Sequence, residues 1–483
     1  MEELFNKTTS KIVDLVRNGS FEEAEQLCNQ ALKVFDDIVF KQYLGICYIG
    51  LQKYEEAKII FEENIKNADL SADYNNLCIV MRFLKRYEES YLAGVKAITL
   101  TKDNPSFYGN LATTAKILAK DVEALELITK AVALNPDNCT FWFDKGAMHF
   151  SIGDIKNAEI CYRSGLRINK QHEKYFVELF YAMGLQNKFP EAWKYYEYRY
   201  NTMPQVNNII KKTNLEVLLE KKDFYPEKIL ISFEQGHGDN MMYLRFLPEF
   251  QKKAPNSYLL VQDSCFKKYV EEIGVKSSDK ILDGTEKILC MMSLPYHLDI
   301  ISIPPPIVTN KHTPTASNKL KVGICYAGSA LHPMDYQRST PLNWYDVFIQ
   351  DQEIECYSFV KDRRPRIHKE TQKVINYSEG FEDYKIVDLS KGLTDVDGTM
   401  NQLNKIDVLV TVDTFVAHIA GTMGVPTYLI LSNLPDWRWG LKENETQWYP
   451  SFKIFRQKDD MKKVILEVYG KIRSEFIAPY SER

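Results

Sequence analysis

The sequence lacks the features that mark secreted, membrane-spanning and nucleic-acid-binding proteins. No uninterrupted apolar run reaches the roughly 18 residues of a membrane-spanning helix, and Met1-Glu2-Glu3-Leu4 does not begin an apolar leader. The net charge of −4 leaves no excess of positive charge for binding nucleic acid through bulk electrostatics. The nine cysteines are scattered and form no CxxC pair. These absences predict a cytoplasmic protein with reduced thiols.

The first 200 residues instead contain a repeat. A small residue within a run of helix formers recurs every 33 or 34 residues, at Ala24, Ala57, Ser90, Ala124, Ala158 and Ala192. This period and its helix–turn–helix pattern resemble the tetratricopeptide repeat, in which each unit buries its apolar face only against its neighbours. The resemblance predicts an all-α superhelix of about six repeats over 1–200, with a groove that binds an acceptor protein or peptide. The alternative is that the array only buttresses the following domain.

From residue 228 the pattern changes to alternating strands and helices. The run Lys228–Phe233 predicts a strand, the glycine-bearing segment Glu234–Asp239 a turn, and the segment that follows an amphipathic helix. A proline-rich run near residue 304 predicts a break between two such α/β lobes. The predicted parts are a linker at 201–227, a first lobe at 228–303, an interlobe linker at 304–319, a second lobe at 320–458, and a C-terminal helix and tail at 459–483.

The most informative stretch lies in the second lobe. The apolar run Val408–Val412 predicts a buried parallel strand that ends at Asp413-Thr414, where a helical pattern begins. The helix N-terminus offers unpaired N–H groups at the carboxyl end of a strand, which is where α/β sheets bind phosphate. His418 falls one helical turn after Thr414 and can face the same crevice. The alternative is a capped helix with a buried histidine.

Residues 228–458 resemble glycosyltransferase family 9, the heptosyltransferase-like group, in the order and spacing of five blocks. The resemblance implies two Rossmann-like lobes in the GT-B arrangement, with an acceptor side and a nucleotide-sugar donor side. It further implies a metal-independent, inverting sugar transfer, with no permanently bound cofactor. The blocks are Glu234–Asp239; Met292–Pro295; Val322–Gly328 with Asp335–Ser339; Val412–Gly421; and Pro435–Gly440 with Trp448–Pro450 and Phe455–Gln457.

The resemblance also implies roles for individual residues. Asp239 is the candidate general base, or alternatively only a helix N-cap, and His237 is a second candidate or a solvated loop histidine. Arg338 is expected to contact the diphosphate, or to form a surface salt bridge. The segment Asp436–Trp439 is expected either to contact sugar or to pack as a hinge cluster. The expected donor-binding residues are Gly236, Gly238, Tyr326, Gly328, Arg338, Asp413, Thr414, His418, Asp436 and Trp437.

The donor sugar and the role of one basic segment stay open. Phe415 stands where heptosyltransferases usually have glycine, so the donor sugar is not fixed. The basic run 361–366 fits a phosphate contact or a solvated loop. The sequence predicts a glycosyltransferase acting on a protein recruited by the repeats. The alternatives are a catalytically weak or inactive scaffold, and a transferase for a glycan, a lipid carrier or modified DNA.

Overall fold

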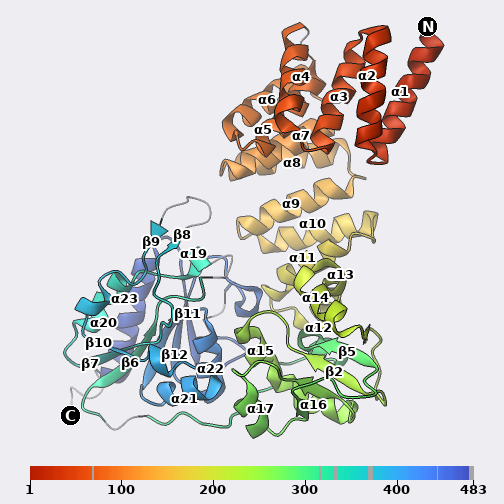
Figure 1. The fold of residues 1–483 in the computed structure, drawn as a ribbon. Helices are drawn as coiled ribbons and strands as arrows, with labels where there is room; N and C mark the ends of the chain where they lie inside the picture. The colour runs from red at the N-terminus through yellow and green to blue at the C-terminus, as the bar shows by residue number, and fades with distance from the viewer. Residues whose placement is uncertain (68–69, 315–316, 331–334, 368–373, 443, 478–483) are drawn as a thin grey trace. The chain divides into compact units, whose positions relative to one another are not determined.

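The computed structural model describes residues 1–67, 70–314, 317–330, 335–367, 374–442 and 444–477. The chain divides into unit 1, Met1–Tyr175, and unit 2, Phe176–Arg483, each described here by itself (Figure 1). Unit 1 is all helical, and unit 2 contains parallel sheets. In the described part of the chain, no helix is long and apolar enough to cross a membrane.

Unit 1 is an array of helices in which successive helices pack side by side. The small residues of the repeat lie where the helices cross, and Ala24, Ala57, Ser90 and Ala124 are fully buried. A side chain larger than these would separate the paired helices, so the period predicted from the sequence is confirmed as a packing period. The helices are α1 (Glu2–Arg17), α2 (Phe21–Phe35), α3 (Ile38–Gly50), α4 (Tyr54–Asn67), α5 (Ser71–Phe83), α6 (Tyr87–Leu100), α7 (Pro105–Ile117), α8 (Asp121–Leu134), α9 (Cys139–Ser151) and α10 (Ile155–Ile168).

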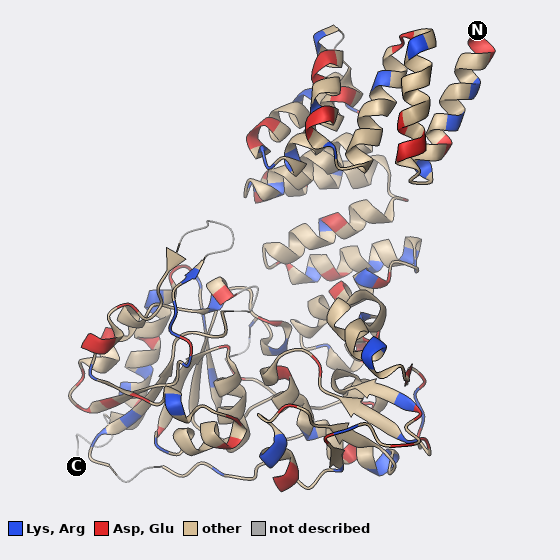
Figure 2. Cartoon of the chain, in the orientation of Figure 1, with Lys and Arg blue, Asp and Glu red and all other residues tan. Residues whose placement is uncertain are grey.

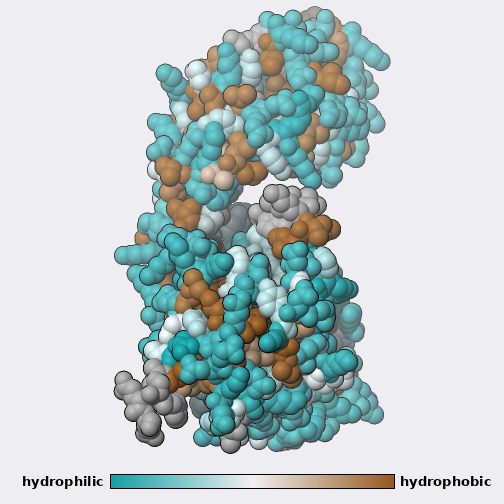
Figure 3. Space-filling view, turned by 90° about the vertical axis from the view of Figure 1, so that its left-hand side faces the viewer, coloured by the Kyte–Doolittle hydropathy of each residue, from teal (hydrophilic) through white to brown (hydrophobic). Residues whose placement is uncertain are grey.

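The turn inside each helix pair repeats as well. Gln52, Lys85, Ala119 and Gly153 occupy the same repeat position and all have positive φ, between 56° and 80°. Such a left-handed residue ends a helix and lets the chain reverse. Charges of both signs are interspersed along these helices (Figure 2). On the face drawn in Figure 3, hydrophobic residues of this unit lie in small groups among hydrophilic ones.

Unit 2 begins with a second group of helices and a five-stranded parallel sheet, ordered β1-β5-β2-β3-β4. The segment 201–227, predicted to be a linker, instead holds α14 and β1. Strand β1 has only two residues, one of them a glutamate, so it lacks the apolar run that identifies a buried strand. The elements are α11 (Glu173–Gly184), α12 (Phe189–Tyr196), α13 (Arg199–Thr202), α14 (Pro204–Thr213), β1 (Glu216–Val217), β2 (Ile229–Ser232), α15 (His237–Tyr243), η1 (Leu244–Phe246), α16 (Leu247–Lys253), β3 (Tyr258–Leu260), α17 (Lys267–Glu272), β4 (Ser277–Ser278), β5 (Lys287–Cys290), η2 (Met291–Ser293) and α18 (Leu294–His297).

A six-stranded parallel sheet follows, ordered β10-β7-β6-β11-β12-β13. Its central strands β11 and β12 are buried along their whole length. The predicted tail beyond residue 477 lies outside the described residues. The elements are β6 (Leu320–Cys325), α19 (Asp335–Arg338), η3 (Leu342–Tyr345), α20 (Asp346–Ile349), β7 (Ile354–Ser358), the hairpin β8 (Arg366–Ile367) and β9 (Val374–Ile375), β10 (Ile386–Asp388), α21 (Val396–Leu403), β11 (Val408–Val412), α22 (Phe415–Met423), β12 (Thr427–Leu431), η6 (Trp437–Trp439), β13 (Phe452–Arg456) and α23 (Met461–Ile472).

Each sheet has one point where the chain order reverses, and ligands of open α/β sheets bind there. In the first sheet this switch point lies between β2 and β5; in the second it lies between β6 and β11. Helix α15, which follows β2, packs against α22, which follows β11. The segments that follow β2 and β11 in the chain are therefore brought together.

Candidate functional site

The turn from β11 into α22 has the geometry that the sequence predicts. Thr414 is the N-cap, and its side-chain oxygen accepts a hydrogen bond from the Ala417 N–H at 3.4 Å. The helix ends at Gly424, which has φ of +77°. The carbonyl oxygen of Asp413, just before the cap, accepts a hydrogen bond from Arg338 Nη1 at 2.9 Å. A guanidinium group thus lies beside the positive end of the helix.

The loop after β6 lies across the switch point from this turn. The guanidinium groups of Arg338 and Arg366 contact this loop at Gly328. A Cβ atom on Gly328 would lie 2.6 Å from Arg338 Nη2, so only glycine lets Arg338 lie across the loop. The Gly328 carbonyl accepts a hydrogen bond from Arg366 Nη2 at 2.9 Å. Asp335 pairs with both arginines. Arg338 is therefore not a surface salt bridge in this structure but part of the switch point.

Helix α15 reaches this region because Gly238 has no side chain. A Cβ at Gly238 would lie 2.6 Å from His418 Cδ2. The N-cap of α15 is Gly236, and the neighbouring Asp239, the third residue of the helix, accepts a hydrogen bond from the Gly236 N–H at 3.2 Å, so Asp239 supports the cap but is not the N-cap of the alternative hypothesis. Asp239 also forms an ion pair with Arg438, which comes from the second half of the unit. The aspartate therefore both supports the cap of α15 and contacts the opposite lobe.

Arg438 is the centre of a buried charge cluster. Its guanidinium is 7% exposed and lies 2.9 Å from Asp436 Oδ1, in addition to its ion pair with Asp239. Burial raises the pKa of Asp436 to about 6, with Arg438 opposing the shift. Burial also raises the pKa of Asp239, while the positive charge of Arg438 acts to lower it. For Asp413, burial is outweighed by Arg438, His418 and Arg338, which hold the pKa of that carboxyl below its ordinary value.

His418 is enclosed beside this cluster. Its ring is 3% exposed, stacks on Trp439 with centroids 5.5 Å apart, and has Nδ1 3.0 Å from the Tyr449 hydroxyl. Its Nε2 lies 3.8 Å from Asp413 Oδ1. Burial lowers the pKa of His418 to about 3, so the imidazole is neutral near pH 7. The residue packs the two lobes together and lies next to the carboxylate predicted to bind donor.

His237 lies at the rim of the same region. Its side chain is 51% exposed, and Nε2 is 2.7 Å from Asp263 Oδ2. The imidazole ring centroid is 5.4 Å from that of Phe415, the first residue of α22. A carboxylate partner fixes the orientation of an imidazole, so His237 has the surroundings of a candidate base as well as of a solvated histidine.

Two predicted donor-binding side chains point elsewhere. Tyr326 is fully buried, and its hydroxyl lies 2.8 Å from Ser378 Oγ inside the lobe. Trp437 is 4% exposed and packs within a cluster of aromatic rings, as the hinge hypothesis predicts. Both residues follow the predicted motif pattern, but an aromatic side chain gains more by burying its ring in the available core. Neither ring is open to a sugar in this structure.

Of three further residues of the site region, Asp263 was not identified from the sequence, whereas Arg438 and Arg366 were considered only as members of the segments 436–439 and 361–366. Arg438 and Asp263 meet their partners only through the fold, at sequence separations of 199 and 26 residues. The basic run 361–366 divides: Arg364 is 85% exposed, as expected for a solvated loop, whereas Arg366 is 9% exposed and reaches the switch point. The sequence indicated Arg366 through its position in a run of arginines. Such a run does not show which guanidinium is buried and which is exposed.

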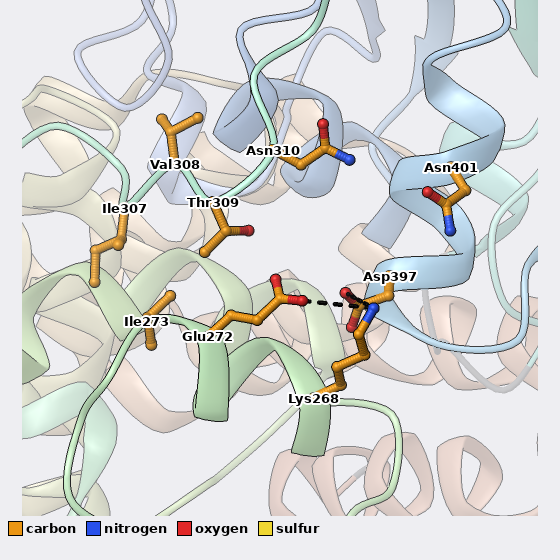
Figure 4. Close-up of a pocket in the computed structure, with 9 residues that line it drawn as sticks. All are labelled: Lys268, Glu272, Ile273, Ile307, Val308, Thr309, Asn310, Asp397 and Asn401. Carbon is orange, nitrogen blue, oxygen red and sulfur yellow. Dashed lines mark ion pairs between the residues drawn. The ribbon is translucent and has the colours of Figure 1, made fainter.

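A cavity of about 570 Å³ lies away from these residues, where α17 and α21 flank the interlobe segment (Figure 4). Lys268 lies within it, 3.1 Å from Asp397 and 3.5 Å from Glu272. None of the predicted site residues lines this cavity. Its lining consists of Lys268, Glu272, Ile273, Ile307, Val308, Thr309, Asn310, Asp397 and Asn401.

Comparison with known proteins identifies one part of the chain. The model of the tetratricopeptide repeat family matches residues 140–172. No curated protein matches the chain. Similar solved structures include a thermophilic TPR protein of Thermus thermophilus (16% identity, 37% of this chain and 98% of that chain, TM-score 0.35) and the pilF protein of Pseudomonas aeruginosa (15%, 44% and 98%, 0.39). A third is YrrB, described as a TPR protein with an unusual peptide-binding site (15%, 39% and 98%, 0.32).

Proposed function

We propose that unit 2 is a GT-B-type glycosyltransferase that transfers a sugar from a nucleotide-sugar donor to an acceptor. The observation that carries this proposal is the meeting of Asp239, from the end of β2, with the switch point of the second sheet. Two parallel sheets with their loops directed at one charged cluster suit a reaction between two substrates, one bound to each lobe.

The donor diphosphate is assigned to the second switch point. The N-terminus of α22, Arg338 and Arg366 supply N–H donors and positive charge there. The Nε atoms of Arg366 and Arg438 are buried without a hydrogen-bond partner among the described residues, which leaves N–H donors for an anion. These groups can stabilise the leaving diphosphate in the way that a cation does in other transferases. The transfer is therefore proposed to be metal-independent.

The acceptor hydroxyl is assigned to the side of the first lobe. A base removes its proton while its oxygen attacks the anomeric carbon, and the bond from that carbon to the diphosphate breaks with its electrons going to phosphate oxygen. Attack from the face opposite the diphosphate inverts the anomeric centre. Asp239 is the proposed base because it faces the second lobe; His237, held by Asp263, is the alternative.

The repeats of unit 1 suggest protein–protein interaction, and the family match over 140–172 supports this role. We propose that they recruit the acceptor protein. Acceptors on a glycan, a lipid carrier or modified DNA remain alternatives. In the competing hypothesis, unit 2 has lost turnover and the whole chain is a scaffold.

A ligand panel separates these hypotheses. The full chain and Asp413→Ala are heated with UDP-, GDP-, ADP-, dTDP- and CMP-sugars. A donor at 100 times its dissociation constant adds about 2.7 kcal/mol to the stability of the wild type. Stabilisation of the wild type alone by one donor supports the transferase, and loss of slow donor hydrolysis in Asp239→Asn would support the assigned base. Absence of any response would contradict the proposal and favour the scaffold.

A further inference from the structure

The helices that precede the first sheet form part of the framework of the candidate site. Helix α12 carries Ala192, the sixth small residue of the repeat series, and α11 precedes it. Trp437, in the short helix η6, inserts its side chain into the aromatic pocket that these two helices provide. Its ring centroid lies 4.9 Å from that of Phe180, 5.7 Å from that of Phe189 and 6.1 Å from that of Trp193. All three contacts are edge-to-face, the arrangement that aromatic pairs favour.

The pocket is shaped for this indole. A Cβ atom at Gly184, on α11, would lie 3.1 Å from Trp437 Cε3 and 3.2 Å from its Cβ, so the backbone of α11 lies directly on the tryptophan. Trp448 closes the cluster with its ring centroid 6.2 Å away. The tryptophan is thus held from several sides, and the backbone of η6 is held with it.

Arg438 is the next residue in the chain, and its position depends on that backbone. Its guanidinium carbon lies 5.2 Å from the centroid of the Trp437 ring, within cation–π range. Asp436 caps η6 by accepting a hydrogen bond from the Arg438 N–H at 3.2 Å. From this position Arg438 reaches across to Asp239. The contacts run from the α11–α12 pair to Trp437, then to Arg438, and finally to the candidate base.

We propose that Trp437 is a positioning residue, through which the sixth-repeat helices α11 and α12 hold Arg438 against Asp239. This deepens the proposed function, because it rests on Asp239 belonging to the reacting site. It goes beyond that function by making the last repeat helices part of the catalytic framework as well as of the repeat array.

The test follows the protonation of Asp239 directly. The full chain is treated with a carbodiimide and an amine over a range of pH, and labelling at Asp239 is followed by peptide mass spectrometry. Burial opposes ionisation of Asp239, as do Asp413 and Glu234, whereas Arg438 and the Gly236 N–H favour it. In Trp437→Leu we expect the pH midpoint of the Asp239 titration to rise by about one unit, because Arg438 is no longer held in place. Arg438→Met should raise the pH midpoint of the Asp239 titration by at least as much.

Two further variants separate positioning from general packing. Trp437→Phe keeps an aromatic ring in the pocket and should restore the wild-type midpoint. Phe176→Leu removes a different ring of α11, one that stacks on Tyr198 at 4.0 Å, and should leave the midpoint unchanged. If Trp437→Leu does not fold, Phe180→Leu removes one wall of the pocket and should raise the midpoint in the same direction.

The readout needs no donor, so two failures can be told apart. An unchanged midpoint in Trp437→Leu or its substitute, while Arg438→Met shifts it, would overturn the positioning role whatever the activity. A shifted midpoint in a protein that binds no nucleotide sugar would uphold the positioning role and contradict the proposed function. With an active enzyme, the same shift should appear in the pH profile of donor hydrolysis and be reversed in Trp437→Phe.

Discussion

The two parallel sheets of unit 2 have equivalent switch points, but the crevices are filled differently. At the first, Arg199 of α13 is fully buried, pairs with Glu234 at 2.7 Å and donates to Ser293 Oγ at 2.9 Å. Glu234 in turn accepts a hydrogen bond from the Met292 N–H at 2.7 Å. At the second, the N-terminus of α22 and the guanidinium groups of Arg338 and Arg366 border the crevice. A protein guanidinium fills the first crevice, whereas the second retains donors for a ligand.

This difference shows that equivalent topology need not mean equivalent function. The first crevice fastens the preceding helices to the sheet, since Arg199 also contacts Glu197 at 3.1 Å and the hydroxyl of Tyr200 lies 3.1 Å from Ser293 Oγ. A buried hydrogen-bonded network of this kind fixes one arrangement of the chain. At the second crevice, the Nε atoms of Arg366 and Arg438 are buried without a hydrogen-bond partner among the residues that the structure describes, which costs stability unless a ligand binds. The proposed donor site therefore lies at the second switch point, whereas the buried network at the first acts as an anchor.

The largest effect should come from breaking the anchor. Arg199→Met leaves the buried Glu234 and the partly buried Glu197 without their partner, and we expect a loss of about 3 to 5 kcal/mol in the free energy of unfolding. Chemical denaturation of the full chain measures it. Arg364→Ala, at a side chain 85% exposed, is the matched control and should change stability by less than about 0.5 kcal/mol. A small loss in Arg199→Met would show that the first crevice is not an anchor.

Lowering the pH should reduce the free energy of unfolding more through His418, beside the second sheet, than through His297, near the first. Burial lowers the pKa of His418 to about 3 and that of His297, near the first sheet, to about 4. Between those values and about 6.5 the unfolded state binds more protons, so stability falls as pH falls. The two losses of stability are at most about 5 and 3 kcal/mol.

Denaturation at pH 7 and pH 3 tests this order, because at pH 4 the two losses are still nearly equal. His418→Gln should flatten the pH dependence more than His297→Gln does, after each variant is compared with its own stability at pH 7. Equal slopes in both variants and in the wild type would contradict the burial of these neutral imidazoles.

Ligand affinity should respond only at the second crevice. Arg338→Ala removes a charged donor at the assigned diphosphate site, and we expect donor affinity to fall by about 10- to 100-fold, or about 1.5 to 3 kcal/mol. Isothermal titration with the donor identified in the panel measures this change. Arg363→Ala removes an arginine of the basic run 361–366 that pairs with Asp388 instead, and should bind donor as the wild type does. Equal losses in the two variants would point to a general effect of charge.

The smallest effect concerns the contact between α15 and α22. Gly238→Ala places a Cβ 2.6 Å from the His418 ring, and we expect a loss of about 1 to 3 kcal/mol in stability. Gly470→Ala, in the interior of α23 with open space around it, is the control and should be neutral or stabilising by up to about 1 kcal/mol. Thermal unfolding compares the two. An unaffected Gly238→Ala would mean that the two helices can separate freely.

The sequence predicted the features that depend on local pattern. The helical repeat, the strand Val408–Val412 and a helix cap at Asp413 or Thr414 follow from periodicity and from residue preference, and the structure confirms them, with Thr414 as the cap. Partnerships across long separations could not be predicted in this way. Arg199 meets Glu234 and Arg438 meets Asp239 only after folding, because an ion pair leaves no periodic signal in the chain.

The same limit explains why two predicted donor-binding residues point away from the candidate site. Motif position assigned Tyr326 and Trp437 to the donor, but a motif does not state which way a side chain points. Tyr326 turns into its lobe and Trp437 into the pocket of α11 and α12. Unit 2 begins at Phe176, within the segment predicted as the repeat array, and a repeat pattern does not show what its final unit contacts.

The most direct test of the central claim is amide hydrogen exchange of the full chain with and without a saturating nucleoside diphosphate that stabilises it. The account predicts slower exchange at the second crevice, in 326–330 and 412–418, and unchanged exchange at the first, in 232–235 and 290–293. Protection at the first crevice alone, or at neither when binding is saturated, would contradict the proposed donor site at the second switch point.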